Sequence, residues 1–423
     1  MAATYDKKLA INGGTPVLSQ GSIQKWPPVD ELDEKMVLES LRGDNHAFGP
    51  NCSALETEFA EWNGNDYAIT TNSGTAALHM GLFAAGCGSG DEVIVTAYSW
   101  SSSATCILQH NCIPVFVDID WHTMNIDVTK IEAAVTPKTK AIIVVHLHGL
   151  AVEMDPVMDI AKRHGLKVIE DACQAHGATY KGKKVGTIGD CGAFSFNQNK
   201  CMCSGEGGMF VTNDQKMLED ARMLWSFGET RTPVESRDYH VYAMGWMYRN
   251  NDLTAAFGRA QLTRLSDNLA TTRANAKALD DNLQDVPNII LPKAVPAESE
   301  PNWYNYVIRF DMEALGHTDD AADFRGKILG ALGAEGTRMM AWQQFILPAM
   351  TVFQARNGYG QGCPWNCPNA QDVDYSVENY PVATKHSDQH ACVVMELRPP
   401  NGPDVAEATA KAIRKVMENV DQL

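Results

Sequence analysis

Short apolar segments alternate with amphipathic segments along residues 67–227. The apolar segments are flanked by glycine and polar residues, as buried strands are, and the segments between them have the three-to-four-residue spacing of helices. This alternation predicts an α/β fold with a mostly parallel sheet and helices on both faces. The predicted strands are Tyr67–Thr71, Glu92–Thr96, Pro114–Val117, Ala141–His146, Lys167–Glu170, Ala193–Phe196 and Met209–Thr212. The predicted helices are Glu31–Arg42, Ser53–Trp62, Thr75–Ala85, Ser101–Gln109, Ile131–Ala134, Met154–His164 and Gln215–Phe227.

The pattern changes in the second half of the chain. Leu253–Leu283 is a long, largely helical stretch, and beyond it Tyr306–Phe310 is the clearest strand and Pro403–Val420 a terminal helix. A loop rich in Pro, Gly and Asn covers 347–378, and loops of this length are usually functional or disordered. We therefore expect a large domain, 1–262, followed by a smaller C-terminal α/β domain, 263–423.

Composition narrows the class of protein. The 423 residues carry a formal net charge of −17, which argues against a nucleic-acid partner. No apolar run reaches membrane-spanning length, and Met1–Gly13 lacks the apolar core of a signal peptide. Most of the eleven cysteines fall in apparent core segments, which fits reduced thiols in a cytoplasm. The pairs Cys201/Cys203 and Cys363/Cys367 lack the two-residue spacer of a zinc knuckle, so no metal is expected.

Lys200 lies between two apolar segments in a stretch with little other charge. Most lysines are solvated surface residues. A lysine in such a place can act as an amine nucleophile, which is what a Schiff base with an aldehyde cofactor requires. The alternative is an ordinary lysine at the end of a strand, and the lysine alone does not decide between the two.

Other polar residues follow the predicted strands, where parallel sheets bind their ligands. Asn72–Thr75 opens a helix, and the free N–H groups of a helix start form either an anion pocket or a simple capped end. Asp171, followed by Gln174, is placed to hold a ring nitrogen protonated, or else to form a turn. Tyr98 and Trp100 follow the second strand and are either stacking partners for a flat ring or core aromatics.

Ser195 precedes Lys200 by five residues and is either a phosphate donor or a small packed residue. Each of these signals is weak when taken alone. Together, and in this order on an alternating α/β chain, they form a complete site for pyridoxal phosphate: a phosphate cup, a stacking ring, a partner for the pyridinium nitrogen, and a lysine.

At this point the sequence resembles the DegT/DnrJ/EryC1/StrS family, the sugar aminotransferases of pyridoxal phosphate fold type I. The resemblance implies a large domain with a mostly parallel, seven-stranded-type sheet and a smaller C-terminal domain. It covers most of the chain and rests on blocks that occur in family order. These blocks are 72–78, 90–95, Pro114–Asp118, His146–Gly149, Glu170–Asp171, Gln174–Ala178, Gly192–Phe196, Lys200 and Gly205–Gly208.

The resemblance also implies roles for individual residues. Lys200 is expected to form the Schiff base and to move the proton between the substrate carbon and the cofactor. Asp171 is expected to pair with the pyridinium nitrogen, and Gln174 to contact the ring hydroxyl. Trp100 is the residue expected to stack on the ring, with Tyr98 as the weaker candidate. The phosphate contacts are expected from Ser73, Gly74, Thr75 and Ser195.

Family members are dimers whose active sites lie at the interface, and Gly245–Asp252 resembles the segment that reaches into the partner's site. Many members have asparagine where this chain has Met247, and methionine cannot donate to a phosphate. Arg249 or Asn250 is expected to substitute for it. The loop around Cys363–Cys367 also departs from the family pattern and is expected to tune the acceptor pocket.

The family chemistry implies that glutamate or glutamine donates an amino group to a keto sugar or keto-cyclitol in amino sugar biosynthesis. Asn12–Pro16, Ser204–Gly208 and Asn379–Ala383 look nearest the branch that acts on scyllo-inosose-type cyclitols. Three alternatives stay open. The acceptor is a nucleotide-linked keto sugar or an octulosonate, the enzyme is a lyase or dehydratase with the same cofactor, or the chain is a non-catalytic protein on this scaffold.

Overall fold

The computed structural model describes residues 7–229, 239–296 and 298–423, so the first six residues of the segment tested for a signal peptide lie outside it. Its centre is a seven-stranded sheet in the order β1-β9-β8-β5-β4-β2-β3. Within this sheet β9 runs antiparallel to β1 and β8, and the other neighbours are parallel, as predicted. The strands are β1 (Tyr67–Thr71), β2 (Glu92–Thr96), β3 (Ile113–Val117), β4 (Thr139–Val145), β5 (Lys167–Asp171), β8 (Cys191–Ser195) and β9 (Gly208–Thr212).

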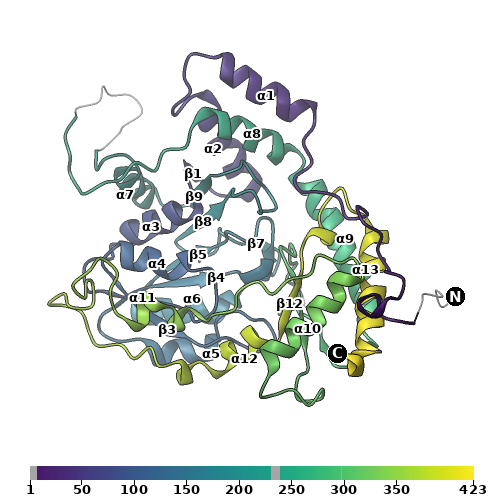
Figure 1. Ribbon diagram of the computed structural model, residues 1–423. Helices are drawn as coiled ribbons and strands as arrows, with labels where there is room; N and C mark the ends of the chain where they lie inside the picture. Colours follow the sequence, from purple (N-terminus) through teal and green to yellow (C-terminus); the bar gives the residue numbers. More distant parts are fainter. Residues whose placement is uncertain (1–6, 230–238, 297) are drawn as a thin grey trace.

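Helices cover both faces of the sheet (Figure 1). One apolar core joins the sheet to α3 (Gly74–Ala84), α4 (Ser102–Gln109) and α7 (Gln215–Trp225). The opposite core joins it to α2 (Pro50–Asn63), α6 (Met154–His164), α8 (Asp252–Thr263) and the start of α9 (Leu265–Leu283). Outside these layers, α1 (Glu31–Arg42) packs on α8, and short elements connect the rest: α5 (Val128–Ile131) and the hairpin β6 (Thr179–Tyr180) and β7 (Lys183–Lys184).

A second, antiparallel sheet lies in the C-terminal part of the chain, with β10 (Ile289–Ile290), β11 (Tyr306–Phe310) and β12 (His390–Val393). The helices α9, α10 (Ala321–Ala334) and α13 (Pro403–Met417) share its apolar core. The core also contains Leu9, so the N-terminal arm packs on the C-terminal part of the chain (Figure 1). The domain boundary between 262 and 263 stays a prediction.

The long loop is packed on the large sheet and contains the short helix α11 (Thr351–Gln354). Tyr375 donates its hydroxyl to the Pro114 carbonyl, and Cys363 lies 3.9 Å from Asn111, so the tip of the loop sits at the amino ends of β2 and β3. This is the end of the sheet opposite Asp171. In its own chain the Cys363–Cys367 loop thus lies away from Asp171, and the expectation that it tunes the acceptor pocket stays a prediction.

The described residues contain no helix that is both long enough and apolar enough to cross a bilayer. All eleven cysteines are free thiols. In the same residues no cluster of three or more His, Cys, Asp and Glu side chains is arranged to hold a metal ion. α12 (Pro381–Gln389) completes the described helices, and its start is capped by Asp118, which accepts from the N–H groups of Val382 and Ala383.

Candidate active site

The predicted site residues meet beyond the carboxyl ends of the parallel strands. Asp171 ends β5 and Ser195 ends the neighbouring β8. The turn after β1 reaches the same place, because a Cβ on Gly74 would lie 2.8 Å from the Ser195 Cβ and 2.7 Å from the Cys173 Sγ. The start of α3, predicted to bind the phosphate, therefore contacts Ser195 and Cys173, and the Cys173 N–H donates to the Asp171 carboxylate.

Asp171 is a buried carboxylate held by neutral donors. Its Oδ2 accepts from the Ser103 hydroxyl at 2.7 Å, and its Oδ1 accepts from the Cys173 N–H at 3.2 Å. The Ser103 hydroxyl is in turn 2.9 Å from that of Ser99. No ion pair to Asp171 is found among the described residues. A buried carboxylate without a cation is costly, so this environment fits a ligand that brings a positive charge.

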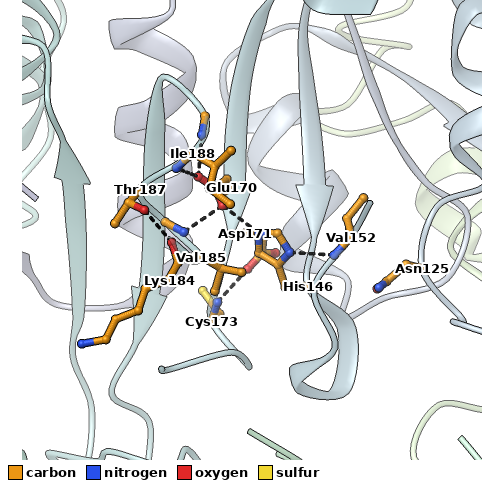
Figure 2. Close-up of polar contacts among 12 residues, drawn as sticks. Asn125, His146, Val152, Glu170, Asp171, Cys173, Lys184, Val185, Thr187 and Ile188 are labelled. Atoms are coloured by element: carbon orange, nitrogen blue, oxygen red, sulfur yellow. Dashed lines mark hydrogen bonds and ion pairs between the residues drawn. The ribbon is translucent and has the colours of Figure 1, made fainter. Parts of the chain in front are cut away.

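Glu170 fixes the end of β5 from the other side of the strand (Figure 2). Its carboxylate is fully buried and faces the His146 Nε2 at 2.9 Å, while the Val152 N–H donates to the His146 Nδ1. That bond places the imidazole proton on Nε2, so His146 donates to Glu170. Burial alone would raise the pKa of Glu170, but His146 and the backbone donors outweigh burial and hold it below its usual value. The backbone donors are the N–H groups of Gly186, Ile188 and Gly189.

The predicted phosphate cup is the start of α3. The Ser73 Oγ caps this helix by accepting from the Ala76 N–H at 3.1 Å. The N–H groups of Gly74 and Thr75 have no acceptor in the described residues, as expected for the first turn of a helix. Gly208 lets β9 pass close by, because a Cβ there would lie 2.6 Å from the Ser73 carbonyl oxygen. These free N–H groups and the positive end of the helix fit a phosphate.

Lys200 follows β8 in a turn closed by its own N–H, which donates to the Asn197 carbonyl at 2.8 Å. Its Nζ lies 4.7 Å from the centre of the Tyr304 ring, and its carbonyl accepts from the Trp26 indole at 3.1 Å. The nearby Cys173 does not compete as a nucleophile, because burial, together with the charge of Asp171, raises the pKa of its thiol. The charge of Lys200 also acts on the Cys173 thiol, so Lys200 is the candidate amine of this region.

The Gln174 amide is oriented by its neighbour. Its Oε1 accepts from the backbone N–H of His148 at 2.9 Å, which leaves the NH₂ group as the part that can reach a ligand. An NH₂ donor suits the ring hydroxyl oxygen that the sequence assigned to Gln174. The assignment itself stays a prediction.

The two aromatic candidates after β2 differ in their surroundings. Trp100 is 54% exposed and lies beside Trp342, with 6.3 Å between the ring centroids. Tyr98 is fully buried against His386 and Trp342, and its hydroxyl donates to the Gln343 carbonyl at 3.1 Å. Tyr98 therefore anchors the C-terminal segment and is not available to a cofactor ring, and Trp100 remains the stacking candidate.

The segment Gly245–Asp252 runs beside the end of β1 in its own chain. Asn72 donates its N–H to the Tyr248 carbonyl at 2.9 Å, and its amide donates to the Met247 carbonyl at 3.3 Å. Asn250 is buried and accepts from the Thr254 hydroxyl at 2.7 Å, and its Nδ2 lacks a partner in the described residues. The segment thus lies next to the phosphate cup, and its contribution to a partner's site stays a prediction.

Several residues of this region were missed by the sequence. Ser103 could have been noticed as a polar residue in the first turn of a helix that otherwise buries Ala104, Cys106 and Ile107. Tyr304 contacts Lys200 from more than a hundred residues away, and Trp342 contacts Trp100 from more than two hundred, and neither carries a local motif that predicts the contact. They reach the site through the packing of the C-terminal part of the chain on the large sheet.

The phosphate cup, the Asp171 carboxylate and Lys200 together fit pyridoxal phosphate. Such a site is typical of an aminotransferase. Comparison with known proteins agrees: residues 27–397 match the DegT/DnrJ/EryC1/StrS aminotransferase family, and the chain belongs to this family. It is accordingly a pyridoxal phosphate-dependent sugar aminotransferase, and the α/β fold, the cofactor and the enzyme class predicted from the sequence are confirmed.

The relatives differ in their acceptors. The chain is 41% identical over 294 residues to a GDP-perosamine synthase of Caulobacter vibrioides, covering 70% of this chain and 77% of that one. It is 35% identical over 327 residues to an L-glutamine:2-deoxy-scyllo-inosose aminotransferase of Micromonospora echinospora, covering 73% and 76%. A solved aminotransferase from Psychrobacter cryohalolentis superposes with a TM-score of 0.81 at 30% identity, covering 94% of this chain and 100% of that one.

Proposed function

We propose that this aminotransferase moves an amino group from glutamate or glutamine to a keto-cyclitol or an unactivated keto sugar. The observation that carries the proposal is the contact of Gly74, at the start of α3, with Ser195 and with Cys173, whose N–H donates to the Asp171 carboxylate. The charges of Asp171 and Lys200 both act on the Cys173 thiol, which supports Lys200 as the amine of the same site. The relatives named as scyllo-inosose aminotransferases support the donor and the acceptor class.

The residues divide the chemistry between them. When bound, pyridoxal phosphate supplies the electron sink that stabilises negative charge on the substrate carbon. The Asp171 carboxylate would hold the pyridine nitrogen protonated, and Ser103 keeps that carboxylate in place. Ser73, Gly74, Thr75 and Ser195 would hold the phosphate. The Lys200 Nζ would accept a proton from the donor amino acid and return it to the cofactor side, and act in the reverse order on the acceptor.

An aromatic pair supports a cyclic polyol as the acceptor. Trp100 and Trp342 come from opposite parts of the chain and lie with their rings tilted at 43°. Trp100 is 54% exposed and Trp342 is partly buried. Their indoles offer flat apolar faces on which the C–H faces of a cyclitol can pack, while the hydroxyl groups stay at the rim. The same site would admit the donor in the first half of the reaction.

A second acceptor class, a nucleotide-linked keto sugar, is favoured by a different observation. A cavity of about 360 Å³ is lined by Lys25, Arg338 and Gln24. Lys25 directly precedes Trp26, whose indole donates to the Lys200 carbonyl, so the segment that lines the cavity also contacts the lysine turn. Two cations suit a diphosphate, and the Caulobacter relative is named as a GDP-perosamine synthase.

We further propose a cytoplasmic homodimer in which Arg249 takes the place of the missing asparagine. Three large apolar side chains near this segment are exposed in the single chain, at 55% for Tyr242, 67% for Met244 and 47% for Met247. A second copy of the chain would bury them. Asn250 is less suited than Arg249 to reach a partner because its side chain is buried at the start of α8.

The absorption spectrum of the holoprotein during each half-reaction tests the proposed function. Glutamine or glutamate should bleach the yellow band of the lysine-bound cofactor, and scyllo-inosose should restore it and yield an aminocyclitol detectable by mass spectrometry. Restoration by a GDP-linked keto sugar alone would select the second acceptor class. Loss of water or ammonia from the sugar without any amino donor would contradict the transaminase assignment and indicate a dehydratase or lyase.

A further inference from the structure

His148 is a buried histidine beside the predicted cofactor site that has no role in the chemistry described above. It is 0% exposed, and its backbone has a φ of 57°, in the left-handed region that non-glycine residues rarely adopt. This conformation directs its N–H to the Gln174 Oε1, which orients the amide assigned to the ring hydroxyl. Its ring packs edge-to-face on Trp342, with 4.9 Å between the centroids. His148 therefore lies between the cofactor region and the aromatic pair.

Asn305 sets the proton position on the His148 ring. The Asn305 amide nitrogen lies 3.0 Å from Nδ1, and an amide NH₂ can only donate, so Nδ1 accepts and the imidazole proton resides on Nε2. The Asn305 backbone N–H also donates to the His148 carbonyl at 3.4 Å. The Nε2–H is buried and has no partner in the described residues. A buried donor left unpaired is unfavourable, and a bound acceptor atom would remove that cost.

His176 provides a contrast within the same chain. Its two ring nitrogens also lack partners in the described residues, but its ring lies between Phe194 and Phe196, at 5.3 Å and 6.0 Å. An imidazole so enclosed by phenyl rings is a packing residue. His148 differs because it contacts Gln174, Trp342 and Asn305, one aromatic and two polar groups, and Gln174 is itself assigned to the cofactor ring.

We propose that His148 is a specificity-determining residue of the acceptor site, whose Nε2–H donates to a ring hydroxyl of the keto-cyclitol or keto sugar while Asn305 holds the imidazole in place. This inference rests on the proposed function. Burial, with the charges of His390 and Lys200, lowers the pKa of His148, so the group is a neutral donor. A neutral donor suits a hydroxyl oxygen, whereas a donor carboxylate is better matched by a permanent cation.

The two half-reactions of holoenzyme His148→Asn separate acceptor binding from a structural role. Asparagine tolerates the left-handed backbone and keeps the N–H to Gln174, but its shorter side chain withdraws the ring donor. We expect kcat/KM for scyllo-inosose to fall about 10- to 100-fold, mostly through KM. The glutamine half-reaction and the yellow cofactor band should stay within about twofold of the wild type. Asn305→Ala retains the His148 imidazole but removes the amide that holds it in place. This variant should also lower kcat/KM for scyllo-inosose selectively, by a smaller factor.

His176→Asn is the matched control, and it should change both half-reactions by one common factor or leave both unchanged. The inference is overturned if His148→Asn and Asn305→Ala also change both half-reactions equally, or change neither. The proposed function fails separately if the wild-type enzyme is bleached by glutamine and scyllo-inosose does not restore its band. The spectrum of the wild type thus tests the acceptor class. The ratio of the acceptor half-reaction to the glutamine half-reaction, compared between the variants, tests the role of His148.

Discussion

At the scale of single residues, the site depends on a carboxylate whose hydrogen-bond donors among the described residues are neutral. The two oxygens of Asp171 accept from the Ser103 hydroxyl and the Cys173 N–H, and neither contact neutralises the charge. A charge buried in this way interacts strongly with a cation that enters beside it, because little water remains to screen the pair. Asp171 should therefore contribute to catalysis through its charge, and Ser103 through the geometry of one hydrogen bond.

Asp171→Asn should lower kcat about 10²- to 10³-fold, the usual cost of removing a preorganised charge-stabilising contact. Ser103→Ala should lower it only about fivefold, as expected for the loss of one hydrogen bond of about 1 kcal/mol. Steady-state kinetics with glutamine and scyllo-inosose measures both. Equal effects of the two substitutions would show that the charge of Asp171 is not what matters.

At the scale of elements, the N-terminal arm is attached to the C-terminal part of the chain by a buried ion pair. Lys415 on α13 and Glu335 are both fully buried, and their charged atoms lie 2.9 Å apart. The Lys415 Nζ also donates to the Thr15 carbonyl, while Glu335 accepts from the N–H groups of Ala10 and Val17. Breaking such a pair leaves an uncompensated buried charge, whereas removing both charges is often nearly neutral.

Lys415→Met should therefore lower the free energy of unfolding by about 3–5 kcal/mol. Adding Glu335→Gln should recover most of that loss, because the amide keeps an acceptor for the N-terminal arm and removes the unpaired charge. Equilibrium denaturation of the apo protein with urea measures the three free energies. A double variant less stable than Lys415→Met would contradict this account of the pair.

At the scale of the whole molecule, buried neutral histidines make stability depend on pH. Burial lowers the pKa of His79 and His176 to about 3, and that of His390 to about 4. In the unfolded chain these groups titrate near 6.5. Between the two pKa values the unfolded chain binds more protons, so the free energy of unfolding falls as pH drops below about 6.5. Burial raises the pKa of Glu56 to about 7 and also raises the pKa values of Asp280, Asp388 and Glu396, and these carboxyls act in the opposite sense.

The melting temperature of the apo protein should therefore fall between pH 7 and pH 5, with each such histidine contributing about 1.4 kcal/mol per pH unit. Differential scanning calorimetry at a fixed scan rate measures the fall. In His176→Phe the phenyl ring fits the same aromatic surroundings and cannot bind a proton, so the dependence on pH should be shallower. A variant with the slope of the wild type would remove His176 from this account.

The sequence predicted the elements of the large sheet well because their signals are local. α6 begins and ends at the predicted residues, helped by the basic last turn and by Gly165 with a φ of 67°. α10 was missed because Gly326, Gly330 and Gly333 dilute the helical pattern that tertiary packing sustains. β12 was missed because it is a short strand, His390–Val393, that pairs with β11 from eighty residues earlier.

The residues of the site also differ in whether the local sequence indicates them. Lys200, Asp171, Ser195 and the start of α3 follow strand ends, so the parallel-sheet pattern alone indicates that they converge. Ser103 is hidden in a helix, and Asn305 and Trp342 come from the C-terminal part of the chain, where nothing in the local sequence indicates a contact with His148. Residues that are joined only by the packing of distant segments are not visible in a single sequence.

Covalent mapping of the cofactor tests the central claim most directly. The holoprotein would be treated with sodium borohydride, which makes a lysine-bound cofactor permanent, then digested and analysed by mass spectrometry, with Lys200→Ala as the control. We predict that the reduced cofactor is found on the peptide containing Lys200 and that the variant carries none. A reduced cofactor on another lysine, or an unmodified Lys200 in protein that is yellow before treatment, would contradict the account.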